Sequence, residues 1–267
     1  YGVEYVLRDV LEGRDGKARR QRIARGFYGR VVGGDNSEPE DGLDVVTTLD
    51  LEMQDVADRA LRRQLEAQNA LWGTALVMEV ATGDLLAMAN LSRTKSGAYA
   101  EVKNHALSSR MEPGSTFKLA ALLALVDDAG MSLDETFDTG NGARVKVGRT
   151  TVQDSHGLPP LNLKDAVAHS SNVFFARAVY ETYKDDPERY VDYLRHLHLD
   201  RTVGLEEFGA VAPIFPAPGM KIWYPDVSIV NMGYGYAIEL TPLHTLTLYN
   251  AVANDGCMVA PRLVREI

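Results

Sequence analysis

Residues 112–126 read EPGSTFKLAALLALV, and this stretch decides how the chain is organised. A Pro-Gly pair precedes a serine, a lysine follows three residues later, and eight consecutive apolar residues complete the run. Pro-Gly suits the start of a helix, and a wholly apolar run favours a helix that is buried. The stretch predicts one buried helix that carries Ser115 and Lys118 on the same face, because residues three apart on a helix are neighbours.

A second short stretch, HSSNV at residues 169–173, follows about one helix and loop later. A serine hydroxyl is a weak nucleophile until a base takes its proton, and a lysine can be that base only when it is neutral, which burial favours. Lys118 is therefore the candidate base for Ser115. Ser170 would relay a proton to the leaving group, and the Asn172 amide would hold a substrate amide. The combination predicts an acyl transferase with an active-site serine.

Other candidate groups fit this chemistry less well. A second Ser-x-x-Lys at residues 92–95 has no apolar helix behind it and is interpreted as a loop. His169 adjoins Ser170, but a Ser-His pair would leave Lys118 unexplained, so a capping or packing role is favoured. His196 and His198 are two residues apart, which places them on different helix faces. We therefore expect no metal site and no cofactor.

The composition agrees with an enzyme domain. A chain of 267 residues with 45% hydrophobic content can bury a sizeable core in one large domain, or in one domain with a small appendage. The net charge of −9 argues against a nucleic-acid partner. The single cysteine, Cys257, excludes an internal disulfide.

The pattern of elements predicts an α+β fold. Asp50 is a candidate cap for a helix that runs to about Asn69 and packs through Val56, Ala57, Ala60, Leu61 and Leu65. Residues 74–80 and 85–91 read as a hairpin of two central strands covered by helices. Asn162 is a candidate cap for a helix that ends near Ser170. The polar residues 36–42 are a predicted linker.

Several further motifs carry a resemblance to a known family. They are GVE at 2–4, LEGRDG at 11–16, YGRVV at 28–32, VVTTLDLEMQ at 45–54, and GYG at 233–235 with LTPL at 240–243. Together with the two active-site stretches, they resemble the class B penicillin-binding proteins, and more narrowly the division-type (FtsI-like) branch. The resemblance covers essentially the whole chain.

The resemblance implies a serine β-lactamase/D,D-transpeptidase-like fold, in which helices cover a mainly antiparallel sheet. Residues 1–42 would be the end of a non-catalytic pedestal with its linker, and residues 43–267 part of the transpeptidase domain. The implied function is peptidoglycan D,D-transpeptidation through a Ser115 acyl-enzyme, with stem peptides as substrates and β-lactams as covalent inhibitors. The implied setting is the periplasmic side of the inner membrane, with an N-terminal anchor outside this chain. Division-complex proteins, including a partner glycosyltransferase, would be its partners.

The resemblance also suggests two residues around the cleft. Glu112, beside the nucleophile, would either contact substrate or hold its loop. Tyr234, between two glycines, would either line the cleft or pack in the core. The family's third motif, Lys-Thr/Ser-Gly, is expected C-terminal to the Ser-x-Asn stretch and beyond Ile267, so the chain is expected to be a fragment. The sequence Lys95-Ser96-Gly97 precedes the nucleophile and is interpreted as a decoy.

Two alternative functions stay open at this point. A lysine-base serine β-lactamase or β-lactam sensor would share the fold, although residues 1–42 argue against such single-domain proteins. A non-catalytic scaffold in a division complex is kept open by the missing third motif.

Overall fold

The computed structural model describes residues 2–17, 20–30 and 37–267, and its contacts divide the chain into two compact units. The smaller unit comprises residues 1–48 together with 262–267, and the larger comprises residues 49–261. The residues at the C-terminus thus belong with the N-terminal segment, because β11 (Val264–Glu266) pairs antiparallel with β3 (Val46–Thr47).

The smaller unit contains short helices and strands. They are α1 (Val3–Val6), α2 (Arg8–Leu11) and an antiparallel hairpin of β1 (Arg20–Ala24) and β2 (Phe27–Arg30). The predicted linker begins at Asn36, which lies outside the described residues. Its described part is not a free linker, because Ser37 and Glu40 make antiparallel bridges to Lys17 and Arg14. In these bridges the backbone N–H and C=O groups bond to one another, whereas in a free linker they would bond to water.

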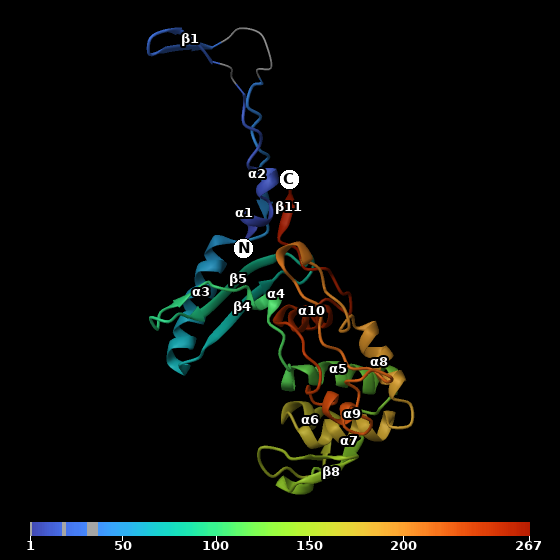
Figure 1. The fold of residues 1–267 in the computed structure, drawn as a ribbon. Coiled ribbons are helices and arrows are strands. Elements are labelled where there is room, and N and C mark those ends of the chain that lie inside the picture. Colours follow the sequence, from blue (N-terminus) through green and yellow to red (C-terminus); the bar gives the residue numbers. More distant parts are fainter. Residues whose placement is uncertain (1, 18–19, 31–36) are drawn as a thin grey trace. The chain divides into compact units, whose positions relative to one another are not determined.

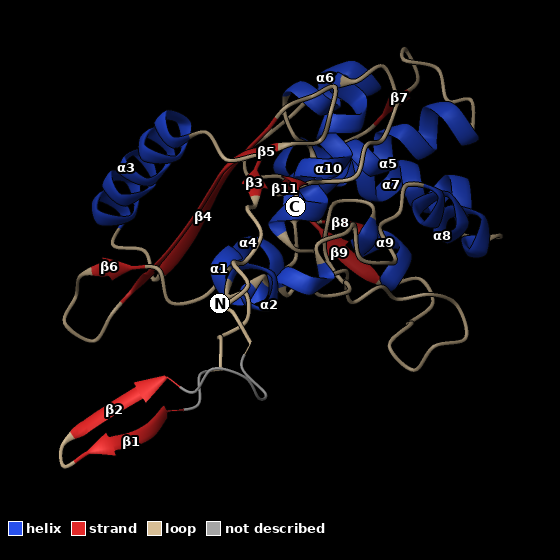
Figure 2. Ribbon diagram, turned by 90° about the horizontal axis from the view of Figure 1, so that it is seen from above, coloured by secondary structure: helices blue, strands red, loops and turns tan. Residues whose placement is uncertain are grey.

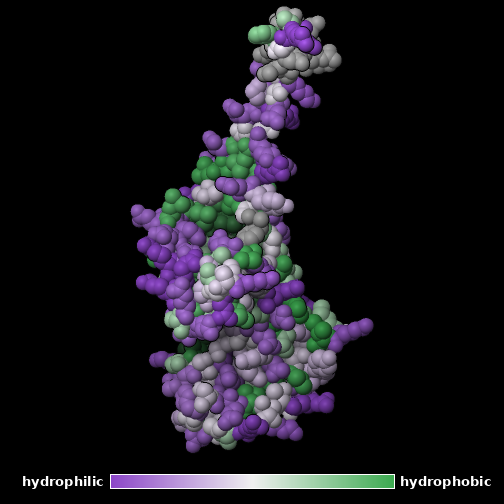
Figure 3. All heavy atoms as spheres, turned by 60° about the vertical axis from the view of Figure 1, so that its left-hand side comes forward, coloured by the Kyte–Doolittle hydropathy of each residue, from purple (hydrophilic) through white to green (hydrophobic). Residues whose placement is uncertain are grey.

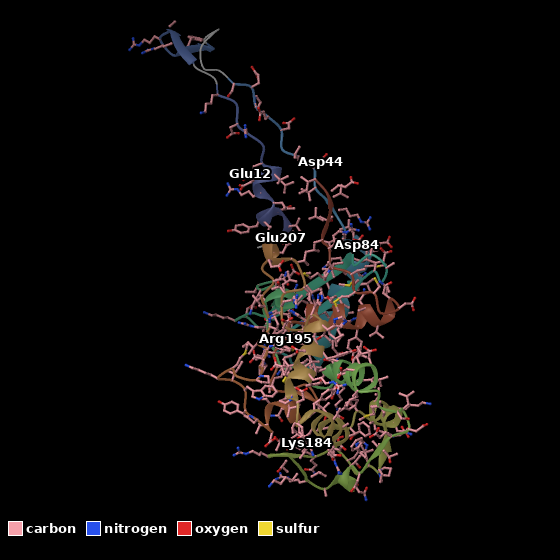
Figure 4. The ribbon with its side chains drawn as sticks, turned by 90° about the vertical axis from the view of Figure 1, so that its right-hand side faces the viewer. Glu12, Asp44, Asp84, Lys184, Arg195 and Glu207 are labelled. Carbon is pink, nitrogen blue, oxygen red and sulfur yellow. The ribbon has the colours of Figure 1, made fainter. Side chains whose placement is uncertain are left out.

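The larger unit is built on a three-stranded antiparallel sheet with the order β4-β5-β6. Its strands are β4 (Trp72–Met78), β5 (Leu85–Arg93) and β6 (Tyr99–Ala100). Helix α3 (Leu51–Gln68) packs on one face of the sheet, as Figure 1 shows. Two further helices, α4 (His105–Ser108) and α10 (Pro242–Ala253), also contact β4. The turn between β4 and β5 carries Asp84, labelled in Figure 4, whose side chain is buried.

The hairpin prediction is confirmed, but the prediction of two central strands holds for one strand only. In β5, Leu85, Ala87, Ala89 and Leu91 are fully or almost fully buried. Strand β4 pairs with β5 alone among the described residues and lies at the edge of the sheet, and its residues are mostly half-buried. The apolar pattern of an edge strand with helices over its faces resembles that of a central strand, so the sequence does not separate the two.

Helix α3 forms where it was predicted. The Asp50 carboxylate accepts a hydrogen bond from the Met53 backbone N–H at 2.9 Å, and Asn69 ends the helix in the left-handed conformation. Its predicted packing face is partly wrong, since Val56 is 59% exposed and Ala60 is exposed too, whereas Ala57 and Leu65 are buried and Leu61 is half-buried. The face that contacts β5 is narrower than the apolar pattern suggests.

Removal of the α3 cap is expected to destabilise the larger unit. Asp50→Ala leaves the Met53 N–H without its acceptor, which should lower the free energy of unfolding by about 1 kcal/mol. The matched control is Asp55→Ala, which removes only an exposed ion pair with Arg59 and should cost at most about 0.5 kcal/mol. Urea unfolding followed by circular dichroism measures both. Equal losses in the two variants would contradict the capping role.

The rest of the larger unit is mainly helical. Its helices are η1 (Gly114–Phe117), α5 (Lys118–Leu123), η2 (Ala124–Asp128), η3 (Gly140–Gly142), α6 (Leu163–Ala168), α7 (Asn172–Tyr183), α8 (Pro187–His196), η4 (Glu206–Phe208) and α9 (Ser228–Met232). Two antiparallel pairs accompany them, β8 (Val145–Val147) with β9 (Thr150–Val152), and β7 (Thr136–Phe137) with β10 (Leu161–Asn162). The helix cap predicted at Asn162 is confirmed, because its side chain accepts from the Asp165 N–H.

The main hydrophobic core surrounds α7. Phe174 and Phe175 of α7, together with Tyr183 and Tyr190, are fully buried within it. Figure 2 shows α5, α6, α7, α8 and α9 gathered on one side of the larger unit, away from β6. On the face drawn in Figure 3, hydrophilic side chains cover much of the larger unit, with hydrophobic residues scattered among them. No helix of the described chain has the length and apolar character needed to cross a bilayer.

The predicted buried helix after Ser115 exists, but its pitch changes twice. A 3-10 turn (η1) leads into the regular α5, and a π-helical turn (η2) completes the run. The hydroxyl of Tyr183 lies 2.8 Å from the Ala124 carbonyl and 2.9 Å from the Asp128 carboxylate, and so reaches polar groups of the wider turn. The run of apolar residues in the sequence is enough to predict where the helix lies. Its change of pitch coincides with the contacts of Tyr183, which come from a distant part of the chain.

Candidate active site

The four residues predicted to carry the chemistry come together in the structure. Ser115 lies in η1 and is exposed, whereas Lys118 begins α5 and is only 5% exposed. The Lys118 Nζ lies 3.2 Å from the Ser115 Oγ, as expected for residues three apart on a helix. An exposed hydroxyl beside a buried amine gives a substrate access to the serine while the amine stays shielded from bulk water.

The turn between α6 and α7 supplies the other contacts of Lys118. Its Nζ lies 2.5 Å from the Ser170 carbonyl oxygen, 3.0 Å from the Ser170 Oγ and 2.7 Å from the Asn172 Oδ1. Together with the Ser115 Oγ, these three oxygens place four acceptors around the Lys118 Nζ, whereas an ammonium has only three N–H donors. Because the Asn172 oxygen faces Lys118, the NH₂ of the same amide is the end that can donate to a substrate.

The environment of Lys118 favours loss of its proton. Burial lowers the pKa of Lys118 from 10.5 to about 8, and the negative charge of Asp154 acts in the opposite direction. With a pKa of about 8, roughly a tenth of the amine is neutral at pH 7 and half at pH 8. The Nζ also lies 5.9 Å from the centre of the Phe175 ring.

The turn that carries Ser170 and Asn172 has an unusual backbone. Ser170 has a φ of +52°, in the left-handed region that a residue with a side chain seldom adopts. Ser171 then caps α7, because its Oγ accepts from the Phe174 N–H at 3.0 Å. A left-handed residue between the two helices turns both Ser170 oxygens toward Lys118.

Asp154 is part of this site and was not predicted from the sequence. The residue is 6% exposed, and its carboxylate accepts from the Ser171 hydroxyl at 2.8 Å, the Asn172 N–H at 2.5 Å and the Val173 N–H at 3.2 Å. The residue stands in a polar, turn-rich segment with no local motif. A pattern within the sequence does not reveal it, because its partners are seventeen to nineteen residues away.

Glu112 holds the loop that faces the nucleophile. Its Oε1 accepts from the Ala237 N–H at 3.0 Å, and the neighbouring Met111 exchanges two backbone hydrogen bonds of 2.9 Å with Leu240. The hydrogen bond to Ala237 shows that Glu112 supports this loop. A contact between Glu112 and a substrate stays a prediction.

Gly235 brings the same loop against the turn of Ser115. The Gly114 N–H donates to the Gly235 carbonyl at 2.9 Å, and Gly235 has a φ of +91°. A Cβ at Gly235 would stand 1.9 Å from the Gly114 carbonyl oxygen. Only glycine allows this approach, so the second glycine of the GYG stretch helps to fix the backbone in front of Ser115.

A cleft of about 350 Å³ adjoins Asn172. Its lining is polar and contains one carboxylate, two phenol rings and several amides, from Glu112, Thr151, Val152, Gln153, Asn172, Asn231, Tyr234 and Tyr236. Tyr234 is half-buried, donates to the Asn231 Oδ1 at 3.0 Å and packs 5.2 Å from the Tyr236 ring. It therefore both lines the cleft and packs against the core.

The decoy candidates lie elsewhere or play local roles. Residues 94–97 form the turn between β5 and β6, and Figure 2 shows β6 far from α5. The second Ser-x-x-Lys is only partly a loop, since Ser92 lies within β5 and its Oγ lies 2.7 Å from the His105 Nε2. His169 is exposed at the C-terminal cap of α6, with its ring 6.4 Å from that of His156.

Comparison with known sequences gives a consistent set of relatives. Residues 73–267 match the family described as the penicillin binding protein transpeptidase domain. Penicillin-binding protein PbpB of Mycobacterium tuberculosis is 30% identical over 99% of this chain and 39% of its own length. The probable peptidoglycan D,D-transpeptidase PenA of Neisseria meningitidis is 26% identical over 97% of this chain and 44% of its own length. The chain thus spans about two fifths of the length of these relatives.

Solved structures share the fold. Penicillin-binding protein 2X of Streptococcus thermophilus superposes with a TM-score of 0.80 over 99% of this chain and 39% of that one, at 22% identity. Apo penicillin-binding protein 3 of Mycobacterium tuberculosis gives a TM-score of 0.79 over 98% of this chain and 55% of that one, at 27% identity. The α+β prediction and its implied transpeptidase-like fold are confirmed.

Proposed function

Because this chain belongs to the family of penicillin-binding protein transpeptidase domains, we propose that it carries the acylating centre of a peptidoglycan D,D-transpeptidase. The observation that carries the proposal is the position of the Lys118 amine, which is buried and lies 3.2 Å from the exposed Ser115 hydroxyl. Burial also lowers the pKa of this amine. The names of two relatives, both peptidoglycan D,D-transpeptidases, favour this activity over β-lactam hydrolysis.

The first half of the reaction forms an acyl-enzyme. Neutral Lys118 takes the proton of Ser115, and the Oγ attacks the carbonyl carbon of the penultimate D-Ala of a stem peptide. The Ser115 N–H, at the start of the helix, is one donor for the oxyanion that forms. The C–N bond then breaks, and the proton passes from Lys118 through Ser170 to the amine of the departing D-Ala.

The second half transfers the acyl group to a new amine. An amine from a neighbouring stem peptide attacks the ester carbonyl and loses a proton through the same Ser170–Lys118 pair. The C–O bond to Ser115 breaks, the new amide is released, and the proton returns to the Oγ. The Asn172 NH₂ donates to a backbone carbonyl of the bound peptide in both halves.

A β-lactam enters the same sequence but does not complete it. The Ser115 Oγ attacks the ring carbonyl, the ring C–N bond opens, and the nitrogen takes the proton while remaining attached to the acyl group. The whole drug therefore stays on the serine. A related protein, penicillin-binding protein 3 of Mycobacterium tuberculosis, has been solved in complex with aztreonam and with ampicillin.

The wider setting is proposed with the activity. Residues 1–42 are proposed as the end of a non-catalytic pedestal and residues 43–267 as part of the transpeptidase domain. The full-length protein would act in septal wall synthesis on the periplasmic side of the inner membrane, held by an N-terminal anchor. Its partners would be division-complex proteins, including a glycosyltransferase. One relative is named a peptidoglycan D,D-transpeptidase FtsI homolog, in line with the FtsI-like branch that the motifs resemble.

Intact-mass spectrometry of the full-length protein with benzylpenicillin tests the proposal. We expect a persistent adduct of one drug mass that maps to the peptide containing Ser115. Rapid release of hydrolysed drug would favour a β-lactamase instead, and no adduct at all would favour a non-catalytic scaffold.

Two variants of Glu112 separate loop support from substrate contact. Glu112→Gln keeps an oxygen for the Ala237 N–H, so the melting temperature should stay unchanged. Loss of the charge in the cleft should raise the KM for a stem-peptide donor about fivefold, the equivalent of about 1 kcal/mol. Glu112→Ala removes the acceptor as well and should lower the melting temperature. An unchanged KM in both variants would leave Glu112 with loop support alone.

A further inference from the structure

The Asp154 carboxylate is buried at the N-terminus of α7 and uses both of its oxygens there. One oxygen accepts from the Ser171 hydroxyl, and the other accepts from the N–H groups of Asn172 and Val173. All of these partners belong to residues 171–173, the segment that joins the Ser-x-Asn turn to α7.

Asp154 and Ser171 together satisfy the first turn of α7. The Ser171 Oγ accepts from the Phe174 N–H at 3.0 Å while its own hydroxyl hydrogen points to Asp154 at 2.8 Å. The N–H groups of Asn172, Val173 and Phe174 would otherwise lack intrahelical partners. The partial positive charge at a helix N-terminus also stabilises a carboxylate placed there.

This arrangement reaches the reacting atoms through two residues. Ser170 and Asn172, on either side of Ser171, supply three of the four acceptors around the Lys118 Nζ. Ser170 holds a left-handed φ that the chain does not adopt without support from its surroundings. The hydrogen bonds from the next three residues to Asp154 are such a support.

The charge of Asp154 also acts on Lys118. It favours the protonated amine and so opposes the effect of burial. Of the other charged groups on the neighbouring helices, Lys164 and Asp165 of α6 are exposed to solvent, and several others have partners. Asp127 and Asp128 of η2 bind Tyr193 and Arg189, while Arg177 of α7 pairs with Glu181.

We propose that Asp154 is a positioning residue for the acyl transfer: its buried carboxylate holds residues 170–173 so that the oxygens of Ser170 and Asn172 face the Lys118 amine. This role rests on the proposed function and adds a residue to it that no motif contains. The hydrogen-bond partners of the Asp154 carboxylate are Ser171, Asn172 and Val173, so it acts on the reaction through the turn and through its charge.

Asp154→Asn separates the charge from the geometry. An asparagine oxygen still accepts from the Asn172 and Val173 N–H groups, but the negative charge is lost. The neutral amine of Lys118 is the active base, so the acylation rate rises as the pH passes the Lys118 pKa. Removing a nearby negative charge lowers that pKa further, and the midpoint of the pH-rate profile should therefore move to lower pH.

Two matched variants complete the set. Ser171→Ala keeps the charge but removes one bond to the carboxylate and the cap bond from the Phe174 N–H, so it should slow acylation without moving the midpoint to lower pH. Asp154→Ala removes charge and bonds together, and misplacement of the turn should slow acylation by about 10- to 100-fold. The measurements are the rate of benzylpenicillin acylation of the full-length protein from pH 6 to 10, and an NMR titration of the Lys118 side chain.

The outcomes distinguish this proposal from the proposed function. Normal acylation of the wild type, with neither the rate nor the Lys118 titration changed in Asp154→Asn, would overturn the role of Asp154 and leave the function intact. Absence of acylation in the wild type would overturn the function and the role together, even if the NMR titration still located the charge of Asp154 beside Lys118. A shift to lower pH in Asp154→Asn but not in Ser171→Ala supports the proposal.

Discussion

Ser115→Ala is expected to abolish covalent labelling of the full-length protein by benzylpenicillin. The variant lacks the oxygen that attacks the drug, which lies 3.2 Å from the amine of Lys118. Catalysis through a covalent serine intermediate depends wholly on that oxygen, so no slower route to the same adduct remains. Intact mass and mapping of the labelled peptide measure the effect.

The neighbouring hydroxyl gives a matched control. Thr116 follows Ser115 on the same turn, is exposed, and donates its hydroxyl to the Pro113 carbonyl at 2.8 Å. Thr116→Ala should retain labelling within a few-fold of the wild-type rate, because that hydroxyl does not contact Lys118 in the structure. An adduct that persists in Ser115→Ala, or one that maps to a different residue, would refute the assignment of the nucleophile.

Lys118→Arg is expected to reduce the acylation rate about 10²- to 10⁴-fold, the usual contribution of a general base. Arginine keeps a positive charge near the oxygens of Ser170 and Asn172 but does not give up its proton in proteins. The variant therefore tests the loss of the base rather than the loss of a cation. Lys118→Met removes both and should be at least as slow.

The pH dependence gives an independent test of the same base. Because burial lowers the Lys118 pKa to about 8, the wild-type rate should rise tenfold per pH unit below pH 8 and level off above it. The sign follows from the neutral amine being the active form. A rate that is flat from pH 6 to 9, or an ordinary lysine pKa in a direct titration, would contradict the role of Lys118.

Features that depend on a few neighbouring residues could be predicted from the sequence. The cap at Asp50, the hairpin of β4 and β5 and the pairing of Ser115 with Lys118 are all of this kind. Each follows from helix or strand geometry over two to seven residues, and that geometry is the same in any surroundings. The transpeptidase-like fold followed from motifs spread along the chain rather than from any single element.

Features that depend on distant pairs could not be predicted in this way. Glu112 meets Ala237 across 125 residues, and the close approach of Gly235 to Gly114 spans a similar separation. The exposure of Val56 and the edge position of β4 likewise depend on what packs beside them. Apolar periodicity reports that a face is covered, but it does not report by which element.

The sequence by itself determined the nucleophile candidate and its base, because residue type and local spacing are enough to place a serine and a lysine on one helix face. It also determined the fold class, through motifs spread along the chain. Only the tertiary structure decided how easily Lys118 loses its proton, since that depends on burial and on the charge of Asp154. The same is true of the turn at Ser170, whose left-handed backbone accompanies hydrogen bonds from the next three residues to a distant carboxylate. Burial and electrostatic fields are properties of the assembled core, and they arise only after distant segments have packed together.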